Sequence, residues 1–151
     1  GGNQGQIIVP WPTSAALMRT AQLQELKLVN LLSRFSDTVR TIKENNTVYS
    51  TSSLTGPLLR VKIKGPRTFN QIVVPPHLRI HIMQFFHDCV GHPGAGRMME
   101  TLSNKYWWSG YQQDTQDYVN HCKFFLRRKP GTGGVVQIQS YLGQDYHFHR
   151  T

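Results

Sequence analysis

Three residues with metal-binding side chains, His87, His92 and Cys122, carry the most specific chemistry in this sequence. Two imidazoles and a thiolate suit a tetrahedral zinc site whose ligands come from a helix end, the loop after it and a later helix. Such a cross-link contributes folding free energy to a domain with few apolar residues per helix. In the alternative interpretation, His87 only ends a helix, His92 belongs to a Gly-Pro turn, and Cys122 is a small core residue.

Helices must position these three side chains. Pro75 and Pro76 end a strand and allow a helix to begin, and the apolar spacing continues this helix through Phe86. A second helix is expected over about residues 95–104, and a third from Tyr111 to about Cys122. The third helix has an inward stripe with spacings of four, three and four, which places Cys122 on the core side. The stripe consists of Tyr111, Thr115, Tyr118 and Cys122.

Upstream of residue 58 the sequence predicts a helical extension. An apolar stripe at helical spacing runs from Leu28 through Leu32, Phe35 and Val39 to Ile42, which predicts a helix or helical pair from Thr13 to about Asn45. The stripe needs a partner surface on this chain or on another, and we favour self-association. Polar and β-branched residues over 45–57 are typical of a linker.

Residues 58–75 predict a β-hairpin with one apolar and one basic face, because apolar and basic side chains alternate along the first strand. The expected fold class is mainly α with this small hairpin: a zinc-stapled helical bundle, helix-turn-helix-like, preceded by an extension with an amphipathic helix. The expected segments are 1–12, disordered or a remnant of processing; 13–57, helical extension and linker; 58–75, basic hairpin; 76–130, zinc-binding helical domain; and 131–151, linker or tail.

The charge is strongly positive, with 17 Lys and Arg against 8 Asp and Glu, a net charge of +9. This surplus favours a polyanion such as nucleic acid. Residues 58–75 and 123–130 contain no acidic residue, so the cations form two flanking patches. The alternatives are a solvated strand face for the first patch and a linker or nuclear-import signal for the second. The candidate DNA contacts are Arg60, Lys62, Lys64, Arg67, Arg97, Lys105, Lys123, Arg127, Arg128 and Lys129.

Length and composition exclude several classes of protein. A chain of 151 residues excludes a large multi-domain enzyme. Two cysteines cannot build a disulfide framework, which indicates a reducing, intracellular compartment. No apolar run approaches the roughly 20 residues of a spanning helix, so no membrane partner is expected.

Several motifs together resemble a known family. Gly91-His92-Pro93-Gly94, the run Tyr106-Trp107-Trp108-Ser109-Gly110, and Tyr118-Val119 before Cys122 look like the His-His-Cys-Cys amino-terminal domain of integrases from gypsy-type LTR retrotransposons and retroviruses. The resemblance covers about residues 58–130. It implies a zinc cofactor, multimerisation and contact with double-stranded DNA at the ends of the element, in the nucleus or an intracellular particle of the element.

The resemblance also predicts a non-catalytic region, because in the family a separate DDE core carries out catalysis. Residues 131–151 contain a single acidic residue, Asp145, and cannot supply the three carboxylates of such a core. We therefore expect the chain as a whole to be a homo-oligomer that positions an integrase on DNA ends. The alternative is a domesticated, transposon-derived protein-interaction module that acts through the helix carrying Leu28.

The sequence departs from the family at one ligand. The family has a second cysteine three residues after the first, where this chain has Phe125, which offers no lone pair to a metal. Cys89 or water could complete the shell, or His147 or His149 could fold back onto it. His121 is adjacent to Cys122, but it points about 100° away on a helix. Alternatively, the site has decayed.

Overall fold

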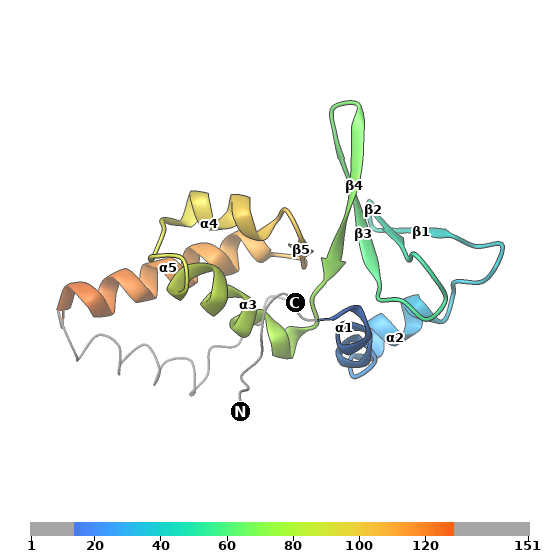
Figure 1. Cartoon of the computed structure of the whole chain (residues 1–151), viewed down its shortest axis with the longest axis horizontal. Helices are drawn as coiled ribbons and strands as arrows, with labels where there is room; N and C mark the ends of the chain where they lie inside the picture. Colours follow the sequence, from blue (N-terminus) through green and yellow to red (C-terminus); the bar gives the residue numbers. More distant parts are fainter. Residues whose placement is uncertain (1–13, 129–151) are drawn as a thin grey trace. The chain divides into compact units, whose positions relative to one another are not determined.

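The computed structural model describes residues 14–128, with side chains described to Cys122. Within this range the chain forms five helices and five strands (Figure 1). They divide into two compact units. Unit 1 takes in the described residues up to Pro75 together with Lys105–Trp107, and unit 2 takes in Pro76–Asn104 and the described residues from Trp108 onward.

Unit 1 contains two short helices and a five-stranded mixed sheet with strand order β1-β2-β3-β4-β5. Neighbouring strands are antiparallel, except that β5 pairs in parallel with β4. The elements are α1 (Ala15–Gln22), α2 (Leu26–Leu32), β1 (Thr41–Glu44), β2 (Thr47–Ser50), β3 (Leu59–Lys64), β4 (Arg67–Val73) and β5 (Tyr106–Trp107).

The sheet makes the expected fold class wrong: the protein is not mainly helical with a small hairpin. The expected helix to Asn45 ends at Leu32, and residues 41–50 pair as the antiparallel strands β1 and β2. The reason lies in Asn45 and Asn46, which both adopt positive φ (53° and 64°). Two consecutive asparagines in this conformation form the tight turn that suits a two-residue hairpin, which overrides the helical spacing of Phe35, Val39 and Ile42.

The apolar stripe of the extension packs inside unit 1. Leu28, Leu32, Phe35 and Ile42 are buried in one cluster, with Tyr49 and Trp107 packed against it. Val39 alone among the predicted stripe is exposed. The stripe is therefore not a free face for self-association, because the sheet of the same unit covers it. The cluster comprises Leu28, Leu31, Leu32, Phe35, Ile42, Leu58 and Val73.

Buried Gln22 links α1 to the sheet. Its Nε2 donates to the carbonyl oxygens of Leu58 (3.1 Å) and Val73 (2.7 Å), and its Oε1 accepts from the Leu58 N–H at 2.7 Å. One side chain thereby satisfies backbone groups where β3 begins and where β4 ends. Without Gln22, the Leu58 N–H and the Val73 carbonyl would lose this buried partner, whereas the Leu58 carbonyl would still accept from the Val73 N–H at 3.2 Å.

Unit 2 is helical in the described residues. Met98, Leu102 and Trp108 are fully buried, as are Ile82 and Met83. The expected stripe of the last helix is confirmed, since Thr115, Tyr118 and Cys122 are buried. No helix among the described residues is long and apolar enough to cross a membrane. The helices are α3 (Pro76–Asp88), α4 (Ala95–Leu102) and α5 (Tyr111–Arg128).

Candidate functional site

The turn after α3 places two imidazoles side by side. Gly91 and His92 both adopt positive φ (89° and 56°), and the His92 N–H donates to the carbonyl oxygen of His87 at 2.8 Å. Glycine tolerates this conformation at a helix end, and a histidine there is uncommon. The resulting reversal of the chain brings the His87 and His92 rings to 4.7 Å between centroids.

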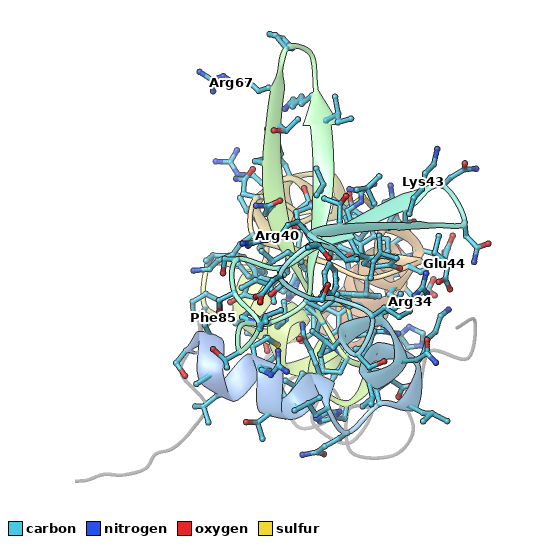
Figure 2. The ribbon with its side chains drawn as sticks, turned by 90° about the vertical axis from the view of Figure 1, so that its right-hand side faces the viewer. Arg34, Arg40, Lys43, Glu44, Arg67 and Phe85 are labelled. Atoms are coloured by element: carbon cyan, nitrogen blue, oxygen red, sulfur yellow. The ribbon has the colours of Figure 1, made fainter. Side chains whose placement is uncertain are left out.

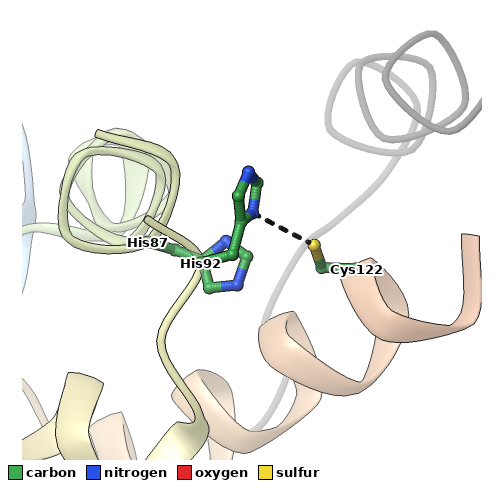
Figure 3. A group of neighbouring side chains, drawn as sticks. All are labelled: His87, His92 and Cys122. Atoms are coloured by element: carbon green, nitrogen blue, oxygen red, sulfur yellow. Dashed lines mark hydrogen bonds between the residues drawn. The ribbon is translucent and has the colours of Figure 1, made fainter. Parts of the chain in front are cut away.

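Cys122 completes a three-residue cluster from α5. One possible ligand atom each from His87, His92 and Cys122 lies within 4.8 Å of the others (Figure 3). His87 and Cys122 are buried and His92 is exposed. The structure thus brings together the three ligands predicted from the sequence. Cys89 is exposed and lies outside this group, so its role as a fourth ligand stays a prediction.

The spacing of the cluster fits zinc. His92 Nδ1 and Cys122 Sγ are 3.7 Å apart, close to the roughly 3.6 Å that tetrahedral zinc requires between a nitrogen and a sulfur ligand. In the metal-free protein, burial, followed by the nearby Asp88 carboxylate, raises the pKa of the Cys122 thiol to about 11. A neutral thiol is therefore stable there until a metal ion displaces its proton.

Asp88 and Tyr118 form polar contacts beside the cluster. His87 Nδ1 lies 2.9 Å from Asp88 Oδ1, and the Tyr118 hydroxyl donates to both Asp88 carboxylate oxygens at 3.4 Å. Burial and the Asp88 carboxylate raise the pKa of Tyr118, which keeps its hydroxyl protonated as a donor. Sequence reasoning missed this contact. The position of Asp88 next to His87, a candidate ligand, was the sequence signal that could have predicted it.

Trp108 is a core residue of unit 2. Its side chain is fully buried, and its Nε1–H donates to Asp114 Oδ2 at 2.8 Å. Asp114 lies in the first turn of α5, where a carboxylate also interacts favourably with the helix dipole. The Arg79 guanidinium lies over the Trp108 ring, 5.8 Å from its centroid. These contacts fix the start of α5 and hence the helix that carries Cys122.

The predicted DNA contacts of residues 58–75 lie on one face of the β3–β4 hairpin. The register pairs Arg60 with Gln71, Lys62 with Phe69 and Lys64 with Arg67, and cross-strand partners share a face. β2 pairs with β3 only at Leu59 and Arg60, so the rest of the hairpin stands clear of β1 and β2 (Figure 1). We call Lys62, Lys64 and Arg67 the basic ribbon.

Arg60 differs from the basic ribbon. Its Nη1 donates to Gln71 Oε1 at 2.8 Å, and its guanidinium lies over the half-buried Trp107 ring, 5.1 Å from the centroid. Tyr49 contacts the same ring edge-on. Arg60 therefore belongs to the packing of the sheet as much as to its surface.

The other predicted DNA contacts are spread over the chain. Lys105, just before β5, and Arg97, on α4, are both exposed. Lys123, Arg127 and Arg128 lie on the last part of α5, and Lys129 lies outside the described residues. Only the hairpin cations are placed on one surface by strand register.

Comparison with known protein families supports the metal centre. Residues 74–131 match the family model described as the integrase zinc binding domain. This segment belongs to the integrase zinc binding domain family. The match begins two residues before unit 2 and includes all three residues of the cluster. Searches of curated proteins and of solved structures gave no match.

Proposed function

We propose that this chain is a non-catalytic, DNA-binding region of a retrotransposon-type integrase, and that it positions the enzyme on the ends of the element in the nucleus. The family match of residues 74–131 supports the integrase assignment. The basic ribbon is the observation that carries the DNA-binding part. Multimerisation remains part of the proposal through the resemblance alone.

Zinc has a structural role in this proposal. His87, His92 and Cys122 would hold the ion, joining the end of α3 and its following turn to α5. A bound zinc ion would cross-link these elements and so contribute to the free energy of folding. The positive φ of His92 is a local cost that metal binding would offset.

The charge arrangement of the basic ribbon favours an anionic partner. Lys64 and Arg67 face each other directly across the hairpin, and like charges in that relation destabilise a strand pair. The strand register places one acidic residue, Glu44, on the same sheet face as the ribbon. Its Oε1 is paired with Arg34 Nη1 at 2.7 Å. Figure 2 shows Arg67 at the outer end of the hairpin, away from this ion pair. A DNA phosphate near the ribbon would relieve the repulsion.

Salt dependence of DNA binding tests this proposal. We expect Lys64→Ala/Arg67→Ala to weaken binding to a duplex of arbitrary sequence and to lower the slope of log K against log salt by roughly 0.9 per lost phosphate contact. The matched control is Arg40→Ala/Lys43→Ala, which removes the same charge from exposed residues in and beside β1 (Figure 2). Equal effects of the two double variants, or no effect of the first, would overturn the role of the ribbon.

The interaction-module alternative receives less support. It relies on an apolar helix face around Leu28, and that face is buried within unit 1. We therefore keep DNA as the proposed partner.

A further inference from the structure

Asp88 connects a candidate metal ligand to the helix that carries another. Its carboxylate oxygen Oδ1 lies 2.9 Å from Nδ1 of the adjacent His87. Asp88 ends α3, and Tyr118, whose hydroxyl reaches both of its oxygens, lies on α5 one turn before Cys122. The Tyr118 ring also meets the His87 ring edge-on at 5.3 Å between centroids.

This contact fixes which nitrogen of His87 is protonated. A neutral imidazole has one N–H and one lone pair, and an ionised carboxylate can only accept a hydrogen bond. The contact with Asp88 therefore requires the proton on Nδ1, which leaves the Nε2 lone pair to bind a metal ion. Carboxylates bonded to ligating histidines act in this way, because they fix the tautomer and the ring orientation and raise ligand basicity.

Tyr118 in turn restrains Asp88. The Asp88 side chain is only partly buried, so solvent could otherwise draw its carboxylate away from His87. Tyr118 is 2% exposed, and its hydroxyl donates to both oxygens of the carboxylate. Asp88 therefore has a buried partner on α5 in addition to His87. The chain of contacts therefore runs from α5 through Asp88 to His87.

We propose that Asp88 is a positioning residue that holds His87 as the Nδ1–H tautomer and presents Nε2 to the metal, and that Tyr118 orients Asp88 for this role. The inference rests on the proposed zinc site. It concerns a contact within the chain itself, so it has a readout that does not require zinc.

Long-range proton–nitrogen NMR of the whole chain tests the tautomer directly. The His87 signals are assigned by their loss in His87→Gln. We expect the proton on Nδ1 in both the metal-free and the zinc-bound protein. A proton on Nε2 in the metal-free wild type would overturn the inference, since Asp88 would then have no donor from His87.

Variants separate positioning from general stability. Asp88→Ala should lose the single tautomer and weaken zinc binding by about 10- to 100-fold in competition with a chromophoric chelator. Asp88→Asn keeps the size of the side chain and should lie between Asp88→Ala and the wild type. Tyr118→Phe should lower zinc affinity less than Asp88→Ala. Glu100→Gln, which neutralises an exposed carboxylate on α4 of the same unit, is the control and should match the wild type.

The outcomes distinguish this inference from the proposed function. Unchanged zinc affinity and an unchanged tautomer in both Asp88→Ala and Asp88→Asn would overturn the positioning role. A wild-type protein that holds the Nδ1–H tautomer, loses it in Asp88→Ala and binds no zinc would support the Asp88 contact and refute the zinc site.

Discussion

Phe125 is the residue at which this chain departs from the ligand pattern of the integrase domains that it resembles. It stands three residues beyond Cys122 on α5, at the place of the second cysteine in the pattern. The described side chains supply three donors to the cluster, and a structural zinc site normally has four. We therefore expect phenylalanine at this position to weaken zinc binding at the site.

Phe125→Cys should restore the fourth donor. We expect zinc affinity to rise at least about tenfold, because a thiolate that binds the ion directly should contribute no less than an outer-shell partner does. Competition with a chromophoric chelator measures the change. Phe124→Cys is the matched control, since it adds the same thiol at a position turned by about 100° around the helix. Equal gains from both variants would mean that any nearby thiol suffices.

The metal ligands could be predicted from sequence because each residue type has a narrow chemistry. His87, His92 and Cys122 offer lone pairs, and helical spacing placed Cys122 on the buried face of α5. The Asp88–Tyr118 contact could not be predicted in the same way. It depends on how α3 and α5 meet, and the spacing within one helix carries no such information.

The elements of unit 1 show where helical spacing misleads. Phe35, Val39 and Ile42 continue the spacing of α2, yet Ile42 enters the core from strand β1. The spacing of these apolar residues is compatible with a helix and also with a loop followed by a strand. The Asn45–Asn46 turn favours the strand, because it suits a two-residue hairpin. The β3–β4 hairpin was predictable because strict alternation and the Gly65-Pro66 turn point to the same structure. Gly65 has a φ of 64°, which suits the first position of a two-residue hairpin turn.

Gln22→Leu tests how the elements of unit 1 are joined. The substitution keeps a buried side chain of similar size at this position of α1 but removes all three hydrogen bonds to the backbone at Leu58 and Val73. We expect unit 1 to be destabilised by roughly 2–3 kcal/mol, because the Leu58 N–H and the Val73 carbonyl lose a buried partner. Thermal unfolding followed by circular dichroism measures the loss. Gln24→Leu changes an exposed residue beside α1 and should have little effect; a similar loss there would contradict this role for Gln22.

On the scale of the whole molecule, each unit carries one of the two proposed functions, zinc binding or DNA binding. Unit 2 holds the cluster of His87, His92 and Cys122, and unit 1 holds the basic ribbon. The sequence indicated both features, because ligand types and charge are read directly from composition and spacing. It did not indicate the five-stranded sheet, because β5 is only two residues long and pairs with a strand distant in sequence.

Zinc content tests the central claim most directly. Protein purified without chelator and analysed for metals should contain one zinc ion per chain, and a strong chelator should lower the melting temperature of unit 2. His92→Ala should lose the zinc. His121→Ala, which removes an exposed imidazole beside Cys122, should retain it. A wild-type protein without stoichiometric zinc, whose melting does not respond to chelator, would contradict the account and leave the core around Trp108 to hold unit 2 alone.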